Sequence, residues 1–322
     1  MKAIVYERYG SPDVLECKEI DKPSPGDDEV LIKVRAAALN PLDWRIMGGK
    51  PFIVRLFARK IPKPRRPGVD VAGVVEAAGR NVTELKPGDE VFGSCVNALA
   101  EYACAPAAMI VKKPANITFE QAAAINVGGR TALQGLHDDI RLQPGQKVLI
   151  NGAAGGVGTF AVQIAKWLGA DVTGVCSTKN VELVRSIGAD RVIDYTRDDF
   201  TRGTDRYDVI FDCIGNHGLR ACRRVMAPHA IHLAVGGTFR GLFHLAIRMI
   251  EQVLLSRLGN QKFALVMTKK KKEHLPILRE LAESGKLTSV LDGHYTFSQS
   301  REAMRHLMQG HARGKVVITV SE

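Results

Sequence analysis

The sequence lacks any apolar run long enough to cross a membrane as a helix, which takes about 18 residues or more. The longest candidate, Leu242 to Leu258, is interrupted by two arginines, a glutamate and a glutamine. The first residues, Met1 to Arg8, contain no apolar stretch followed by a small-residue cleavage site, so they do not resemble a secretory signal. We therefore expect a cytoplasmic protein without a transmembrane segment, and we leave open a peripheral contact with a membrane.

Cysteine is scarce, and its spacing indicates neither a metal site nor a disulfide framework. The six cysteines form no C-x-x-C pair, and none stands at a metal-ligand spacing from a histidine. Free thiols in a reducing compartment are the expectation. Nor do the nine histidines form a triad with a serine nucleophile, and the glycine-rich segment is not a nucleophile elbow, which excludes a hydrolase interpretation.

Acidic residues are fewer than basic ones, 34 against 45, and the net charge is +11. The basic residues cluster in two stretches, Lys50 to Arg66 and Lys269 to Lys272, which we expect to be exposed loops or helix starts. No nucleic-acid-binding motif accompanies them, so we do not expect a nucleic-acid partner. An anionic cofactor or a generally basic proteome accounts for the charge equally well.

The chain has the length and the composition of a two-domain enzyme. It holds 322 residues, 45% of them hydrophobic and 25% charged. Short strands separated by turns fill the first part, which suggests a small barrel. From about residue 119, helices alternate with short apolar strands, the pattern of a parallel sheet covered on both faces. The pattern of helices and strands changes again in the last 50 or so residues, which we expect to rejoin the first domain.

The most informative stretch is the glycine-rich segment Asn151 to Gly158, which follows an apolar strand and opens a helix. That context is what a dinucleotide-binding fingerprint requires. Gly155, Gly156 and Gly158 let the backbone turn tightly and approach a pyrophosphate. The helix N-terminus offers free N–H groups and the positive end of the helix dipole. The segment therefore predicts a dinucleotide site at the start of that helix.

The residues after the next strand indicate which dinucleotide binds. In NAD sites an acidic residue at the end of the second strand holds the ribose 2′-hydroxyl, but this chain has Ser177-Thr178-Lys179-Asn180 at that place. A hydroxyl and a lysine suit a 2′-phosphate, which a carboxylate would repel. The alternative, in which Ser177 only caps the next helix and Lys179 is solvated, stays open. We predict NADPH as the cofactor.

Several ordered motifs make this sequence resemble the medium-chain dehydrogenase/reductase superfamily. Within it, the chain is most similar to the zinc-free quinone oxidoreductase branch, which includes zeta-crystallin. The resemblance covers essentially the whole chain. It is carried by residues 38–43, 67–73, 87–91, 153–158, 177–180 and 310–317.

The resemblance implies an α/β protein with two domains. A GroES-like β-barrel domain, residues 1–120 and 266–322, would pack on a Rossmann domain with a doubly wound parallel sheet, residues 121–265. It also implies a homodimer and NADPH in the cleft, with Ser177, Lys179 and Tyr195 holding the 2′-phosphate. The predicted cofactor-binding residues are Thr131, Ala154, Gly155, Gly156, Val157, Gly158, Ser177, Lys179, Tyr195, Cys213, Ile214, Gly215, Val235, Gly236, Gly237 and Lys315.

The zinc-dependent alcohol dehydrogenases of the same superfamily differ from this chain at their metal ligands. Their first cysteine is replaced by Asn40, and their Gly-His-Glu by Gly68-Val69-Asp70. Their structural zinc lobe is missing as well, because Phe92 to Ala105 supplies only two cysteines. We therefore expect no metal site.

The expected reaction is hydride transfer to a quinone or an α,β-unsaturated carbonyl, which is easier than alcohol oxidation because the accepting carbon is already electron-poor. Asn40 is the best candidate for positioning the substrate oxygen or the nicotinamide, and a loop-structuring role for it is equally open. Asp43 is expected to hold the loop and Asp70 to be a structural partner rather than a base. The proton donor is open, with solvent as one source.

Other functions also stay open. A relative of zeta-crystallin could be an NADPH-binding sensor or an RNA-binding protein with little turnover. Within the enzymes, quinone and 2-alkenal or enone reduction are not separated, because the pocket loops, Met47 to Arg66 and Phe239 to Arg257, are the least family-like parts. Phe239 to Leu258 is interpreted as a core-facing helix, with a substrate cover, a dimer surface and a membrane-surface helix as alternatives.

Overall fold

The computed structural model describes residues 1–49, 64–235, 242–257, 259–266 and 271–321. Internal contacts divide the chain into two compact units. Unit 1 is Met1–Val127 with Lys271–Glu322, and unit 2 is Gly128–Lys270. Among the described residues, no helix combines the length and the apolar character that spanning a membrane requires.

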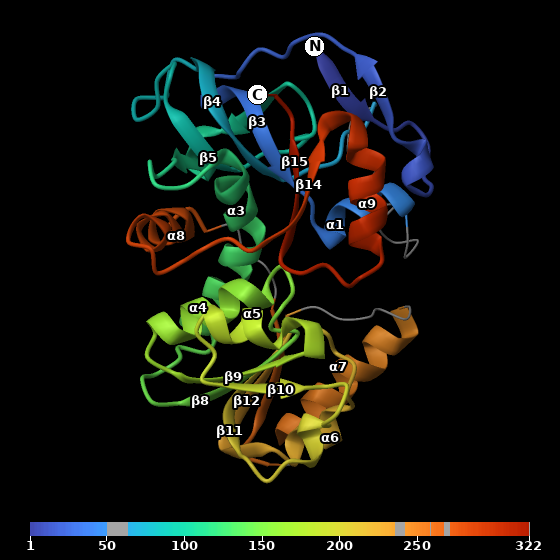
Figure 1. The fold of residues 1–322 in the computed structure, drawn as a ribbon, viewed down its shortest axis with the longest axis vertical. Helices are drawn as coiled ribbons and strands as arrows, with labels where there is room; N and C mark the ends of the chain where they lie inside the picture. The colour runs from blue at the N-terminus through green and yellow to red at the C-terminus, as the bar shows by residue number, and fades with distance from the viewer. Residues whose placement is uncertain (50–63, 236–241, 258, 267–270, 322) are drawn as a thin grey trace. The chain divides into compact units, whose positions relative to one another are not determined.

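Unit 1 contains two antiparallel-rich sheets (Figure 1). Its strands are β1 (Lys2–Val5), β2 (Glu16–Glu19), β3 (Glu29–Ala38), β4 (Asp70–Ala78), β5 (Glu90–Ser94), β6 (Tyr102–Pro106), β7 (Ile110–Lys112), β14 (Leu291–Thr296) and β15 (Lys315–Thr319). Seven of them form one sheet in the order β14-β15-β3-β4-β5-β7, with β6 also on β3, while β1 pairs with β2. Because β15 pairs antiparallel with β3, the end of the chain completes a sheet that its beginning starts.

The helices of unit 1 include one that begins at a reciprocal pair of capping side chains. They are α1 (Pro41–Gly48), the first part of α3 (Phe119–Leu133), α8 (His274–Glu283) and α9 (Ser300–Met308), with 3-10 turns η1 (Pro12–Val14), η2 (Ala107–Met109) and η6 (Phe297–Gln299). At the start of α3, Gln121 N donates to Thr118 Oγ1 and Thr118 N to Gln121 Oε1, a reciprocal cap. Helix α9 buries Ala303 and Met304 against the strand core.

Unit 2 is a parallel sheet. Its strands are β8 (Lys147–Asn151), β9 (Asp171–Cys176), β10 (Arg191–Asp194), β11 (Tyr207–Asp212), β12 (Met226–Ala234) and β13 (Lys262–Leu265). They are ordered β10-β9-β8-β11-β12-β13, and every pairing is parallel. The order runs outward in both directions from β8 and β11, so the predicted doubly wound sheet is confirmed, with its topological switch point between these two strands.

Helices cover the strands of unit 2 (Figure 1). They are α4 (Gly158–Trp167), α5 (Val181–Ser186), α6 (Leu219–Arg223) and α7 (Leu242–Arg257), with the π-helical turn η3 (Gln134–Asp139) and the 3-10 turns η4 (Thr178–Asn180) and η5 (Phe200–Arg202). Helices α4 and α5 contact β8, β9 and β10, and α6 and α7 contact β12 and β13. Burial on both faces explains the continuous apolar runs Val148 to Ile150 and Val209 to Phe211.

The expectation that the basic clusters are exposed is wrong at Arg65. This residue is buried, and its guanidinium lies over the ring of Tyr9 at 5.0 Å from the ring centroid. A cation packed on an aromatic face loses less by leaving water, and the guanidinium is the cation best suited to this. Most of that cluster, residues 50–63, and Lys269 and Lys270 lie outside the described residues.

Candidate active site

In unit 2 the glycine-rich segment forms a tight turn between β8 and α4. Gly152 has a positive φ of 84°, and a Cβ on Gly158 would meet the Gly152 carbonyl oxygen at 2.0 Å. A Cβ on Gly155 would meet only that same oxygen, at 3.4 Å, so this position borders open space. The helical hydrogen bonding begins within the turn, where Thr159 N donates to Gly155 O. The turn therefore leaves a backbone surface at a helix N-terminus, the arrangement that binds phosphate.

Three residues predicted to contact the 2′-phosphate lie at the neighbouring strand ends. Ser177 follows β9 and Lys179 lies in η4, exposed to solvent. Tyr195 follows β10, is 55% exposed, and donates its backbone N–H to Cys176 O, next to Ser177. The Ser177 side chain makes no capping hydrogen bond and instead accepts one from Asn180 Nδ2 at 3.2 Å. The capping alternative for Ser177 is therefore not what the structure shows.

An aspartate that the sequence prediction passed over lies beside these residues. Asp194 ends β10 and is the register partner of Cys176 on β9. Its carboxylate accepts from Thr178 Oγ1 at 2.6 Å and from Thr196 N and Oγ1 at 3.0 and 2.8 Å. The hydrogen bond from Thr178 is the largest of the effects that lower the pKa of Asp194. The parallel pairing of β9 and β10 is what places this acid next to Ser177, and sequence spacing alone gave no sign of it.

Of the remaining residues predicted in unit 2, Thr131 lies on α3, those at 213–215 follow β11, and Val235 follows β12. A Cβ on Gly128 of α3 would meet Gly156 O at 2.4 Å, so this helix touches the glycine-rich turn, and Thr131 lies buried one turn further along. Cys213 donates its backbone N–H to Asn151 O at the end of β8. A Cβ on Gly152 would meet the Ile214 side chain at 2.8 Å. The predictions at Gly236 and Gly237 lie outside the described residues.

In unit 1, four segments far apart in the sequence bring a buried polar cluster together. Lys315 Nζ donates to Asn40 Oδ1 at 2.6 Å and to Asp70 Oδ2 at 2.9 Å, and Asn40 Nδ2 also donates to Asp70 Oδ2 at 2.9 Å. The other oxygen of Asp70 accepts from Asn126 Nδ2 at 2.8 Å and Val127 N at 3.1 Å. All four side chains are less than 5% exposed. A buried ion pair is tolerated here because amide groups satisfy its remaining hydrogen-bonding capacity.

Asp43 joins this cluster to the start of α1. Its carboxylate accepts from Asn40 N at 2.7 Å and from Gly68 N at 3.0 Å, so it ties the helix start to the segment that leads into β4. Burial raises the pKa of Asp43 to about 6, and the two backbone N–H groups oppose that rise. Asp43 therefore keeps a proton to a higher pH than an exposed aspartate does.

Two family models match parts of this chain. The alcohol dehydrogenase GroES-like domain model matches residues 26–115, and the zinc-binding dehydrogenase model matches residues 187–318. A chloroplastic quinone-oxidoreductase from Triphysaria versicolor is 33% identical, over 99% of this chain and 98% of its own. The chain belongs to the medium-chain dehydrogenase/reductase superfamily.

Two further relatives narrow the place of this medium-chain dehydrogenase/reductase within its superfamily. An NADPH-dependent alkenal/one oxidoreductase from Arabidopsis thaliana is 36% identical over 99% of this chain and 79% of that protein. The solved quinone oxidoreductase of Coxiella burnetii superposes with a TM-score of 0.86 at 28% identity, covering 100% of this chain and 99% of the other. Membership of the quinone oxidoreductase branch, inferred from the motifs, is confirmed.

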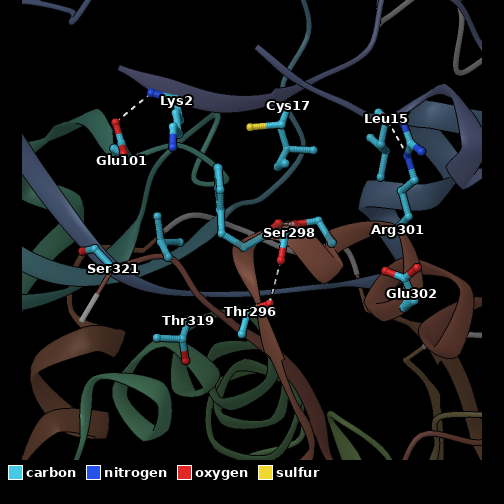
Figure 2. Close-up of a pocket in the computed structure, with 14 residues that line it drawn as sticks. Lys2, Leu15, Cys17, Glu101, Thr296, Ser298, Arg301, Glu302, Thr319 and Ser321 are labelled. Atoms are coloured by element: carbon cyan, nitrogen blue, oxygen red, sulfur yellow. Dashed lines mark hydrogen bonds between the residues drawn. The ribbon is translucent and has the colours of Figure 1, made fainter. Parts of the chain in front are cut away.

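A separate cavity of this medium-chain dehydrogenase/reductase lies entirely within unit 1 (Figure 2). Its volume is about 610 Å³, and it lies between β1, β2, the start of α9 and the end of the chain. Lys2, Cys17, Glu101, Arg301 and Glu302 are among its lining side chains. None of the predicted site residues lines it, so neither the glycine motif nor the polar cluster belongs to this cavity.

Proposed function

We propose that this chain is an NADPH-dependent oxidoreductase that passes a hydride to a quinone or an α,β-unsaturated carbonyl without using zinc. The observation that carries the proposal is the glycine-rich turn at the switch point of a parallel sheet, with Ser177, Lys179 and Tyr195 at the adjoining strand ends. The names of the relatives, a quinone-oxidoreductase and an NADPH-dependent alkenal/one oxidoreductase, support the substrate classes.

The residues present fit a phosphorylated dinucleotide. The glycine turn borders open space at Gly155, where a backbone can approach a pyrophosphate. Lys179 and the hydroxyls of Ser177 and Tyr195 supply a cation and hydrogen-bond donors for a 2′-phosphate. Asp194 lies beside these residues as an ionised carboxylate, which hydrogen bonds from Thr178 and Thr196 hold in place, and the guanidinium of Arg197 lies 3.7 Å from it and offsets part of its charge. Reduced nicotinamide, when bound, supplies the hydride.

Zinc chemistry does not fit the residues of unit 1, although one matching family model is described as zinc-binding. Asn40 and Val69 stand where the zinc enzymes carry a cysteine and a histidine, and the ammonium of Lys315 already donates hydrogen bonds to Asn40 and to the neighbouring Asp70. This place offers two oxygen atoms that already accept hydrogen bonds from Lys315, and it offers neither the cysteine nor the histidine ligands that zinc prefers. We therefore propose that Lys315 takes the place of a metal in balancing Asp70.

The proposed roles in unit 1 follow from the hydrogen bonds. Asn40 uses one amide hydrogen on Asp70, which leaves its second N–H for a substrate oxygen or the nicotinamide amide. Asp43 holds Asn40 in place through the backbone N–H of that residue. Lys315 spends two of its three N–H donors on Asn40 and Asp70, and we propose that the third meets the cofactor. We also propose a homodimer and a cytoplasmic location.

The test is loss of absorbance at the reduced-nicotinamide band, with NADPH and NADH in parallel. The acceptors are an ortho-quinone, a para-quinone, a short 2-alkenal and a long-chain enone, with alcohol oxidation as the negative control. We expect NADPH turnover with an electron-poor acceptor that a chelator leaves unchanged. Lys179→Ala should raise KM for NADPH by about tenfold or more, because it removes a cation from the phosphate, and should leave KM for NADH unchanged.

Three results would contradict parts of the proposal. A preference for NADH would mean that Ser177 and Lys179 do not read a 2′-phosphate. Loss of activity with a chelator, restored by zinc, would contradict the zinc-free mechanism. Tight NADPH binding without turnover on any acceptor would point to a sensor or RNA-binding protein instead, and salt-dependent RNA binding would then be measured.

A further inference from the structure

The switch point of unit 2 carries a buried charge. Asp212 ends β11 and is the register partner of Asn151, which ends β8. These strands are the two at which the sheet order reverses, and ligands of open α/β sheets bind outside the carboxyl ends of such strands. The Asp212 side chain is 1% exposed. The residues that follow it, Cys213 to Gly215, are among those we predict to contact the cofactor.

Asp212 joins the segments that form this edge of the sheet. One oxygen, Oδ1, accepts from Asn151 Nδ2 at 2.8 Å, Ile214 N at 3.1 Å and Gly215 N at 2.8 Å. Asn151 Nδ2 also donates to Asn216 Oδ1 at 2.9 Å. The backbone oxygen of Asp212 accepts from Val235 N at 2.8 Å. Asp212 therefore holds three segments together through hydrogen bonds. They are the start of the glycine-rich turn, the segment after β11 and the segment after β12.

The carboxylate stays ionised in spite of its burial. Burial by itself would raise the pKa of Asp212, but His232, Gly215 N and Asn151 outweigh it and bring the pKa to about 2. His232 Nε2 lies 3.4 Å from Asp212 Oδ2, and neither of these two buried atoms has a hydrogen-bond partner among the described residues. The next residue, Cys213, is a neutral thiol, because burial raises its pKa.

A neutral side chain could accept the same N–H groups at lower cost. Burying an ion is expensive even when it is hydrogen-bonded, whereas an asparagine oxygen would serve Asn151, Ile214 and Gly215 equally well. Ionised groups held against burial are found where a site needs their charge. The hydrogen bonds alone do not require an aspartate at this position. We therefore look for a function of the negative charge of Asp212.

We propose that Asp212 is a fixed negative charge that favours the oxidised, positively charged nicotinamide over the reduced, neutral one. This inference rests on the proposed function. In the reaction the C4–H bond of reduced nicotinamide breaks, its electron pair and the hydrogen join the electron-poor carbon, and the acceptor oxygen later takes a proton. The ring is left with one positive charge, which a nearby buried anion stabilises. Asp212 thus makes hydride donation more favourable.

The test is a binding measurement rather than an activity measurement. Dissociation constants for NADPH and for NADP⁺ are measured by isothermal titration calorimetry for the wild type and for Asp212→Asn, which keeps the shape and an acceptor oxygen. We expect the ratio of the NADP⁺ constant to the NADPH constant to rise by about five- to tenfold in the variant, the size of one charge in a partly buried site. The matched control is Asp208→Asn near the other end of β11, where the half-buried carboxylate accepts Lys147 N and the ratio should not change.

The outcomes separate the charge from the hydrogen bonds. If Asp212→Asn weakens both cofactor forms equally, Asp212 only holds the loops and the proposal is overturned; an unchanged ratio overturns it too. If the variant does not fold, Ile214→Lys is compared with Ile214→Met, since Ile214 is 41% exposed and follows Asp212 closely. The lysine, by offsetting the charge of Asp212, should raise the ratio relative to methionine, and an equal ratio overturns the proposal.

Failure of the proposed function gives a different result. In that case the wild type binds neither NADPH nor NADP⁺, and both proposals are wrong. If the wild type binds both forms, only the ratio decides, and the proposed function survives whatever Asp212→Asn shows.

Discussion

The polar cluster of unit 1 and the glycine-rich edge of unit 2 are built on opposite principles. Asn40, Asp70, Asn126 and Lys315 come from four distant segments, and their side chains balance charge in a buried place. The edge of unit 2 is built from short segments that each follow a strand, and its central feature is the absence of side chains at Gly152, Gly155 and Gly158. Removing one charged partner should therefore destabilise the cluster, whereas adding a side-chain atom should destabilise the turn.

The largest expected effect is at Lys315. Lys315→Met leaves Asp70 buried without its cation, and we expect the free energy of unfolding to fall by about 4 kcal/mol. Urea denaturation measures it. The control is Lys33→Met on β3, an exposed lysine whose loss should cost less than about 0.5 kcal/mol. Adding Asp70→Asn to Lys315→Met should recover part of the loss. Equal costs for the two lysines would mean that Asp70 needs no cation.

A slightly smaller effect is expected at Gly158. Gly158→Ala places a methyl group 2.0 Å from a backbone carbonyl oxygen that cannot move without disturbing β8. We expect a loss of stability of about 3 kcal/mol, measured by the same denaturation. A variant as stable as the wild type would show that the turn rearranges freely, and the contrast between added atoms and removed partners would disappear.

Asp43 makes the stability of unit 1 depend on pH. Its pKa of about 6 in the folded chain exceeds the ordinary value of 3.8, so between about pH 4 and pH 6 the folded chain keeps a proton that the unfolded chain has released. Stability from this group is therefore highest at low pH and falls by about 2 to 3 kcal/mol as pH rises through that window. Asp43→Asn cannot titrate, so denaturation from pH 4 to pH 7 should show a flatter profile than in the wild type. Parallel profiles would assign the titration to another group.

The smallest expected change in stability is at Gly155. A methyl group there meets one oxygen at 3.4 Å, so Gly155→Ala should alter the free energy of unfolding by no more than about 0.5 kcal/mol. The methyl group would stand in the open space that we assign to the pyrophosphate, and NADPH binding, followed by fluorescence, should weaken by about tenfold. Unchanged binding would show that the pyrophosphate does not lie beside Gly155.

The sequence predicted the parts of the site that are contiguous. Gly155, Gly156 and Gly158 stand together between a strand and a helix, and Ser177 and Lys179 follow the next strand, so local pattern was enough to find them. Asp194 was missed because it lies at the end of a different strand from Ser177. Its place beside Cys176, and that of Asp212 beside Asn151, come from strand pairing, which sequence spacing does not report.

The sequence by itself determined the two-domain α/β class, the parallel sheet and the glycine-rich turn between a strand and a helix, because periodicity, glycine position and capping residues act over a few neighbouring residues. Only the tertiary structure decided that Lys315 meets Asn40 across a separation of 275 residues, and that burial raises the pKa of Asp43 to about 6. Both depend on burial and on distances between groups far apart in the chain. Burial and these distances are set only when the chain has folded, because folding excludes water and fixes the positions of the charged groups.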